Sequence, residues 1–432
     1  MRPSFLLALV FAVIAAAPCL AQQQGQGGIL VDAKGVIRRA KRGKFVSRKK
    51  LQASAAKSLS ADINKPSEMR VVSLTRLEKE IETLLEEKKP IPDEMMFLAG
   101  LQRVDFLFFL EESKEIVITG PAAGFARDGQ GVMVGVDTGR PVLRLDDLLQ
   151  AMWTKEKSIG CSFDPVQARM ADVQRYLQSV GDAGSIGEAK KRYKKMVEIL
   201  GLQDVRVFGV DPTSHFAKTL VEADYALKRL SVGLEKPRVK GFQSYLDVKG
   251  AGRNTMKRWW FAPKYDGLER NEDGTAWAFT GQRVQLLAQE ELVNDAGQRR
   301  DADYKRETTQ QFARQLNATY PKLAEKLPIL AQLQNTFDIT VVGTLIRQFA
   351  DQVKWNQFTK LKSAKLDRFE VPKQVPSASN SKTRGKYIVV GVVGGGVKIE
   401  PLDVVERSTT ATRGWKEPPK TTTSWWKDAT DP

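Results

Sequence analysis

The chain has 432 residues, 42% of them hydrophobic, so it can bury a core and form two or three domains. The formal net charge of +17 favours contact with anionic partners. Its single histidine excludes a metal site built on several histidines.

Residues 1–21 have the pattern of a signal peptide. Arg2 supplies positive charge, Phe5 to Ala17 is an unbroken apolar run, and small residues precede Gln22. The run is shorter than the ~20 residues that a membrane-spanning helix needs, so we expect cleavage rather than anchoring. The mature protein is therefore expected to be extracytoplasmic, either periplasmic or secreted, where nucleic acid is not an expected partner.

The two cysteines have different predicted fates. Cys19 lies at the end of the apolar run, where it could be lipidated, but the preceding Pro18 argues against this alternative. Removal of Cys19 leaves Cys161 as the only thiol, so the mature chain cannot form an intramolecular disulfide.

Residues 22–65 are expected to form a basic N-terminal arm after a short strand within Ile29–Ile37. Between Ala33 and Ser58 there are ten Lys or Arg residues and no acid. A flexible, solvated arm and a docking patch for a polyanion both fit this run, and both predict exposed side chains. The candidate anion-binding residues are Arg38, Arg39, Lys41, Arg42, Lys44, Arg48, Lys49 and Lys50.

Residues 66–235 are predicted to form a mixed α/β domain. Helical periodicity and a Ser73 cap predict a helix at Leu74–Lys88, and Asp93 is expected to cap a short helix. Two strand pairs should follow, and Asp146 is expected to cap the next helix. The predicted pairs are Val104–Leu110 with Glu115–Thr119, and Gly131–Val136 with Pro141–Leu145.

A strand that leads through Asp-Pro into a helix occurs twice in this part. The pairs are Asp164-Pro165 and Asp211-Pro212, and both are expected to start helices because proline suits the first helical position. A helix at Ile186–Leu200, with the capping box Ser185 to Glu188, lies between them. This order permits a parallel crossover.

Residues 236–370 are expected to form a β-hairpin followed by helices. Ala276–Thr280 and Arg283–Gln289 flank Gly281-Gln282, a two-residue turn pattern. A charged helix is predicted at Asp303–Glu325, and a long apolar helix is predicted from Pro328 to about Val353. Its charged residues favour a buried core helix over a membrane span.

Residues 371–432 are predicted to contain a polar linker, one strand within Tyr387–Ile399, and a disordered tail. Gly394–Gly396 is typical of a turn or bulge, since no phosphate-loop Lys-Ser/Thr pair follows. Trp425-Trp426 lies in the expected exposed tail, where the two side chains would either contact a partner or have no function. By contrast, Trp259-Trp260-Phe261 is expected to lie in a sheet core.

The candidate catalytic residues are weak ones: His215, Glu222 and Cys161. Helical spacing places His215 near Glu222, with Thr219 between them, and places Asp224 on the opposite flank. Cys161 lies in an apolar strand, where a thiol is usually inert packing. The adjacent carboxylates Asp146 and Asp147 fit helix capping better than a hydrolase or a cation site. No cofactor or metal motif is present in the sequence.

Four phrases together resemble a family of exported planctomycete proteins that has no assigned activity. They are GLQRVDFLFF at 100–109, TGRPVLRLDDLL at 138–149, GCSFDP at 160–165 and VEADYALKRL at 221–230. The resemblance spans about Glu94 to Val353. It implies an envelope or periplasmic location and carries over no catalytic residue.

The sequence thus predicts an exported α+β protein whose mixed sheet with strand-Asp-Pro-helix units precedes a smaller strand and helix part. The leading hypothesis is a non-enzymatic interaction or structural protein of the cell envelope. It would contact an anionic envelope polymer, lipid headgroups or an acidic protein without being integral to the membrane. The alternative is a carboxylate-dependent extracytoplasmic hydrolase acting on glycans.

Overall fold

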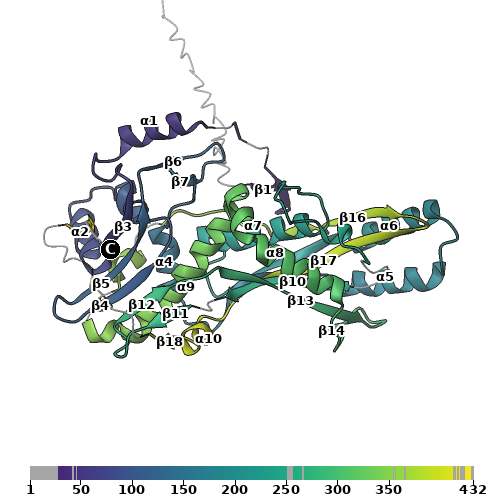
Figure 1. Cartoon of the computed structure of the whole chain (residues 1–432). Coiled ribbons are helices and arrows are strands. Elements are labelled where there is room, and N and C mark those ends of the chain that lie inside the picture. The colour runs from purple at the N-terminus through teal and green to yellow at the C-terminus, as the bar shows by residue number, and fades with distance from the viewer. Residues whose placement is uncertain are drawn as a thin grey trace, which may run out of the picture.

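The computed structural model describes residues 28–429, apart from 41–42, 45, 251–255, 265–266, 354, 356, 364–365, 412–414, 416–417 and 419–423. The expected signal peptide and Cys19 lie outside the described residues. Helices combine with mixed sheets in the described part, which confirms the α+β class (Figure 1).

One large sheet has seven strands in the order β18-β11-β12-β4-β5-β3-β19. The antiparallel hairpin of β4 and β5 is confirmed, and α2 (Leu74–Glu86) follows β3 with the predicted Ser73 cap. The strands of this sheet are β3 (Ser67–Ser73), β4 (Phe106–Leu110), β5 (Glu115–Ala122), β11 (Leu268–Arg270), β12 (Ala276–Phe279), β18 (Thr409–Thr410) and β19 (Trp426–Asp428).

The other large sheet has eight strands in the order β14-β13-β10-β17-β8-β9-β15, and β16 pairs with β17. Both large sheets take strands from either side of the expected boundary at 235/236. The strands of this sheet are β8 (Ile159–Pro165), β9 (Leu202–Phe208), β10 (Met256–Lys264), β13 (Arg283–Val293), β14 (Arg299–Asp301), β15 (Gln374–Pro376), β16 (Ser379–Arg384) and β17 (Tyr387–Ile399). The prediction of a polar linker at Val371–Arg384 is wrong, because β15 and β16 lie within that range.

Strand β17 runs through the middle of this sheet, and its glycines are strand residues rather than a turn or bulge. A Cβ at Gly395 would lie 2.1 Å from the carbonyl oxygen of Trp259, and a Cβ at Gly396 would lie 2.2 Å from that of Cys161. Only glycine therefore fits at these two positions. Trp259 and Phe261 of β10 are fully buried, which confirms the predicted sheet core.

The helices pack between and around the sheets. Helix α9 contacts both β4 and β13, so it bridges the two large sheets, and α7 packs on β8 and β17. Among the described helices, none combines the length and apolar character of a membrane span. The longer helices after α2 are α4 (Leu145–Trp153), α5 (Gln167–Val180), α6 (Ile186–Leu200), α7 (His215–Ser231), α8 (Glu307–Lys326) and α9 (Pro328–Val353). The shorter ones are α3 (Asp93–Met96), η1 (Leu98–Gly100), η2 (Tyr245–Asp247), η3 (Thr359–Ser363) and α10 (Pro401–Glu406).

In both units a strand is followed by Asp-Pro and then by a helix, but neither aspartate caps its helix. Val166 precedes α5, and Ser214 caps α7. Asp164 instead accepts a hydrogen bond from Arg299, and Asp211 accepts one from the backbone N–H of Thr213. β8 and β9 are antiparallel neighbours, so the parallel crossover is wrong.

Two further local predictions are wrong because strand pairing is not local. β12 and β13 flank Gly281-Gln282 but belong to different sheets, so they form no hairpin. β7 (Met133–Gly135) pairs with β6 (Phe125–Arg127), and Pro141 makes only one bridge to Val134. At α3, Pro92 occupies the cap position expected for Asp93.

The N-terminal segment is ordered over most of its described length. The predicted single strand is a hairpin of β1 (Ile29–Val31) and β2 (Ile37–Arg39). Helix α1 (Arg48–Ser58) packs Leu51 and Ala55 against the β6–β7 hairpin, so the flexible-arm alternative does not describe it.

The C-terminal segment is also folded where it is described. Strand β19 pairs with β3 at the edge of the seven-stranded sheet, and Trp425 is only 5% exposed. Trp425 and Trp426 are therefore both packed against the protein: Trp425 lies in the core, and the Trp426 ring lies 4.8 Å from the buried guanidinium of Arg70. The predictions of a disordered tail and of an exposed aromatic contact are wrong for these residues.

Candidate functional site

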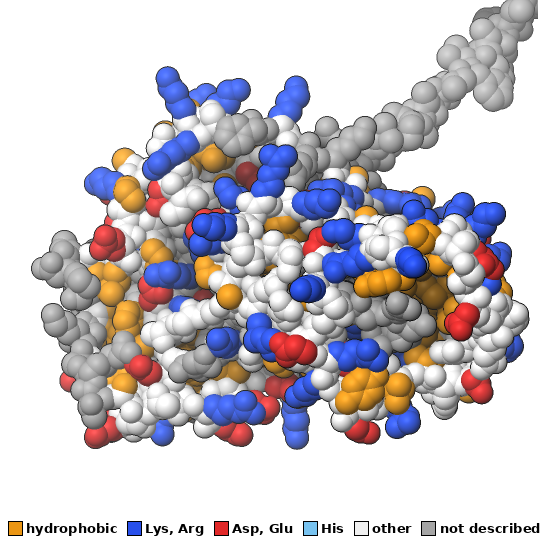
Figure 2. All heavy atoms as spheres, turned by 45° about the vertical axis from the view of Figure 1, so that its right-hand side comes forward, with side chains coloured by type: hydrophobic (Ala, Val, Ile, Leu, Met, Phe, Trp, Pro, Cys, Tyr) orange, Lys and Arg blue, Asp and Glu red, His pale blue; other side chains and the backbone are white. Residues whose placement is uncertain are grey.

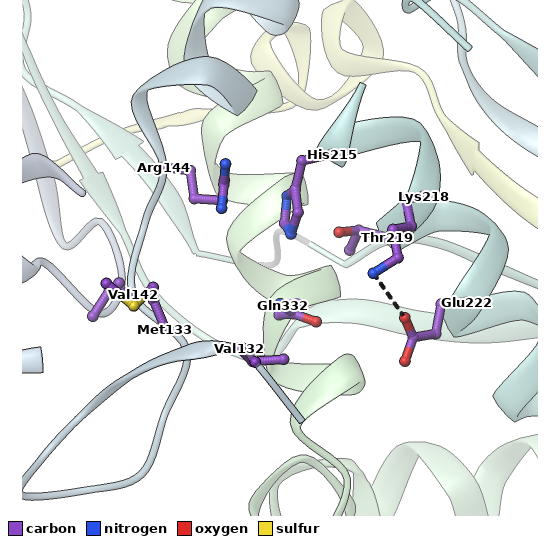
Figure 3. A pocket seen from close by; sticks show the side chains of 10 residues that line it. Val132, Met133, Val142, Arg144, His215, Lys218, Thr219, Glu222 and Gln332 are labelled. Carbon is purple, nitrogen blue, oxygen red and sulfur yellow. Dashed lines mark ion pairs between the residues drawn. The ribbon is translucent and has the colours of Figure 1, made fainter. Parts of the chain in front are cut away.

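Helix α7 presents different side chains on its two sides. Phe216, Leu220 and other predicted apolar positions are fully buried. His215, Lys218, Thr219 and Glu222 recur at the spacing of one helical face and line a polar cavity (Figure 3). Ser214 caps the start of α7, because its hydroxyl accepts a hydrogen bond from the Ala217 N–H at 3.1 Å.

The polar cavity is closed on its other sides by the β6–β7 hairpin region, Arg144 and Gln332 of α9. Val132, Met133 and Val142 supply its apolar wall (Figure 3). About 10 Å³ is open to the centre of a water molecule, which is room for about one water.

His215 forms a buried pair with Asp147 of α4. Nδ1 of the imidazole lies 2.8 Å from Oδ2 of the carboxyl, and the two residues are 8% and 6% exposed. Burial lowers the pKa of His215 well below its ordinary value, and Arg144 lowers it further. Burial raises the pKa of Asp147 to about 7, while Arg144 opposes this rise. The other oxygen, Oδ1 of Asp147, has no hydrogen-bond partner among the described residues.

Asp146 has a different partner from its neighbour. Arg144 holds it by two hydrogen bonds, Nε to Oδ1 at 2.8 Å and Nη2 to Oδ2 at 2.6 Å. The cap position of α4 is occupied by Arg144 without a side-chain cap, so capping by Asp146 is wrong. The two adjacent carboxylates thus serve two separate pairs, one with Arg144 and one with His215.

Lys218 and Glu222 form the other end of the polar cavity. Their Nζ and Oε2 atoms are 4.0 Å apart, the ion pair drawn dashed in Figure 3. The backbone N–H of Gly28 donates to Oε1 of Glu222 at 2.5 Å. Burial raises the pKa of Glu222 and lowers that of Lys218. The Phe369 ring lies 5.9 Å from Nζ of Lys218, which adds an apolar neighbour.

This arrangement is suited to proton transfer. Above about pH 7, where Asp147 is ionised, Nδ1 of a neutral His215 donates to it, so Nε2 keeps a lone pair and can accept a proton. Acid and base groups with perturbed pKa values that gather around one cavity are typical of functional sites.

Cys161 lies apart from the polar cavity, within β8. It is 1% exposed, and burial followed by the charge of Asp224 raises its pKa well above the ordinary value. Asp224 is on the sheet-facing side of α7 and pairs with Lys228 at 2.5 Å. The structure therefore brings His215 and Glu222 together and leaves Cys161 and Asp224 elsewhere.

The described candidate anion-binding residues are exposed, as predicted. Arg38 and Arg39 of β2 pair with Asp32 and Glu235 at 3.0 and 2.7 Å. The others project from α1 or just before it, and no ion pair joins them to the described residues: Lys44, Arg48, Lys49 and Lys50. Lys41 and Arg42 lie outside the described residues.

Sequence reasoning missed Lys218 and Arg144 as lining residues of the polar cavity, and it missed Asp147 as the partner of His215. A polar stripe of His215, Lys218 and Glu222 on a helix whose other positions are apolar could have indicated Lys218. Nothing local indicates that Asp147 meets His215. No group of three His, Cys, Asp or Glu side chains suited to a metal ion is found among the described residues.

Comparison with known protein families finds a similarity over part of the chain. A family model described as a protein of unknown function (DUF1598) matches residues 161–245, which run from β8 to η2. The matched segment contains His215, Lys218 and Glu222 but not Arg144 or Asp147. No curated protein and no solved structure matches this chain.

Proposed function

We propose that the protein is an exported interaction protein of the cell envelope that binds an anionic polysaccharide through α1. The sequence of residues 1–21 supports export, and a chain with one remaining thiol suits an oxidising compartment. The resemblance to exported planctomycete proteins supports the same location. N-terminal sequencing of the mature protein from fractionated cells tests export; a chain in the cytosol that still begins at Met1 would overturn it.

The observation that carries the binding proposal is a fixed helix with an unneutralised cationic face. Leu51 and Ala55 hold α1 on the β6–β7 hairpin, and no ion pair joins its four cations to the described residues. Figure 2 shows Lys and Arg side chains projecting at the top of the molecule, where Figure 1 places α1. The four are Arg48, Lys49, Lys50 and Lys57, all exposed.

A polysaccharide fits this helix better than a lipid surface does. A helix that lies in a membrane interface needs an apolar face directed into the lipid. The apolar face of α1 is already buried against the protein, and its exposed positions are polar, cationic or alanine. Fixed cations on a polar face suit a hydrated polyanion.

The test compares retention of the full chain on immobilised polygalacturonate across a salt gradient. Changing Arg48, Lys49, Lys50 and Lys57 to glutamine should weaken binding about tenfold or more, since each exposed charge pair is worth roughly 0.2–1 kcal/mol. Higher salt should weaken wild-type binding, because it screens exposed charges.

Helix α6 offers a matched control. Lys190, Lys191, Lys194 and Lys195 are also exposed, and changing them to glutamine removes the same charge from a helix remote from α1 (Figure 1). Equal losses of retention in the two variants would show that net charge alone is responsible and would overturn the role of α1.

A second candidate function is acid–base hydrolysis of glycans, with the attacking water held in the polar cavity. It is favoured by two buried carboxyl groups, Asp147 and Glu222, whose pKa values are both raised by burial. The test is glycan turnover by the wild type and by Glu222→Gln and His215→Gln variants. Turnover that survives both substitutions would exclude this cavity as its source.

A further inference from the structure

A larger outer cavity of about 250 Å³ lies next to the polar cavity. Val132, Glu222 and Gln332 line both spaces, and we call the two neighbouring spaces together the cleft. The outer part lies between the β1–β2 hairpin, α7 and the junction of α8 with α9. A buried carboxyl group at the shared wall is thus reached from a space large enough for a small organic ligand.

The outer cavity carries an excess of positive charge. Arg39, Arg229 and Lys326 line it, together with two carboxyl groups, those of Glu222 and Glu235. Glu235 Oε2 lies 2.7 Å from Nη2 of Arg39 and 3.7 Å from Nη2 of Arg229, so one carboxylate serves two guanidinium groups. Each guanidinium has five N–H donors, and although Arg229 Nη2 also donates to the carbonyl oxygen of Leu234 at 3.3 Å, other donors are left for a second anion. Lys326 is exposed and has no ion pair with the described residues.

The two ends of the cleft carry different chemical groups, and the combination indicates one class of ligand. Guanidinium groups recognise carboxylates through paired, charge-assisted hydrogen bonds. At the shared wall, Glu222 and Gln332 offer acceptors and donors of the kind that bind hydroxyl groups. Tyr225 also lines the cavity, and its ring lies 5.6 Å from the Arg229 guanidinium, which helps to position that guanidinium.

We propose that this cleft binds one uronic acid unit, with the carboxylate at Arg39, Arg229 and Lys326 and the hydroxyl groups directed toward Glu222 and Gln332. The unit is either a free monosaccharide or the terminal residue of an acidic oligosaccharide. The proposal goes beyond polymer binding by α1 and rests on neither candidate function, because it requires neither α1 nor turnover.

The test is calorimetric titration of the full chain with glucuronate, galacturonate, glucose and a galacturonate oligosaccharide. One of the uronates should bind with a Kd of about 1 mM or below, and the neutral glucose should bind about tenfold more weakly. Tighter binding of the oligosaccharide than of the monosaccharide identifies a chain end as the ligand; equal binding identifies the free sugar.

Variants separate this cleft from the other proposals. Arg39→Gln and Lys326→Gln change exposed or half-exposed side chains and should each weaken uronate binding several-fold. The α1 glutamine variant should bind the uronate like the wild type even if it loses polysaccharide retention. Equal affinity for glucose and the uronates, unchanged affinity in both cleft variants, or no binding of any uronate would each overturn the proposal.

Discussion

Asp147 of α4 and His215 of α7 are 68 residues apart in the chain, yet their side chains meet at 2.8 Å in a buried pair. Burial favours the neutral form of each group, so their pKa values move in opposite directions. The pair therefore joins two helices and also makes the stability of the protein sensitive to pH in two ways that variants can separate.

The Asp147→Asn variant should lose one of these pH dependences. Burial raises the pKa of Asp147 from 3.8 to about 7, so the folded protein retains a proton that the unfolded chain releases. This contribution to stability is complete below the unfolded pKa and is lost as the pH rises through about 7. Relative to the variant, the wild type should lose on the order of 4 kcal/mol over this window in urea titrations. Parallel pH profiles of the two proteins would contradict the assignment.

The His215→Gln variant should show the opposite relation. A histidine kept neutral by burial contributes stability above its unfolded pKa of 6.5, and this is lost as the pH falls toward its depressed folded value. The wild type should therefore lose stability relative to this variant as the pH falls below about 6.5. The same urea titrations measure this difference in stability between the wild type and the variant. A wild-type advantage that stays constant down to about pH 4.5 would show that His215 protonates freely in the folded protein.

The parts of the fold that local chemistry determines are the parts that the sequence predicts. The Ser185 to Glu188 capping box precedes α6 as expected, with the Ser185 hydroxyl accepting from the Glu188 N–H at 3.2 Å. The long apolar pattern after Pro328 becomes the buried helix α9. In each of these elements the deciding contacts lie within one helix or its first turn.

Strand pairing and the polar cavity depend on contacts between distant residues, which spacing along the chain does not report. Gly281-Gln282 has the local pattern of a hairpin turn, but β12 and β13 find better partners in β4 and β10. Likewise, His215 and Glu222 could be placed on one helical face from the sequence, whereas Asp147 joins them only because α4 packs against α7.

The glycines of β17 should tolerate substitution very unequally. A Cβ at Gly395 would lie 2.1 Å from a backbone oxygen, which cannot move without disrupting the pairing of β10 with β17. A Cβ at Gly394 meets only the end of the Arg299 side chain, at 3.5 Å. Gly395→Ala should therefore destabilise the protein by roughly 3 kcal/mol or more, and Gly394→Ala by less than about 1 kcal/mol. Thermal unfolding measures both; similar losses would mean that the strands can separate locally.

The C-terminal strand should contribute to the stability of the whole seven-stranded sheet. Trp425 is 5% exposed, and the fully buried Arg70 donates to both carboxylate oxygens of Asp428, at 2.7 and 3.2 Å. Trp425→Ala should cost about 3 kcal/mol because it leaves a cavity in the core. Asp428→Ala should cost about 3 kcal/mol or more because it leaves a buried guanidinium without its counterion.

Lys427 provides the control for these two changes, since it lies between them in the chain and its side chain is partly exposed. Lys427→Ala should change the free energy of unfolding by less than about 1 kcal/mol. Denaturant titrations of the three variants measure these changes in the free energy of unfolding. Losses below about 1 kcal/mol in both Trp425→Ala and Asp428→Ala would show that β19 detaches from β3 in solution, which would restore the segment as a free tail with an exposed aromatic pair.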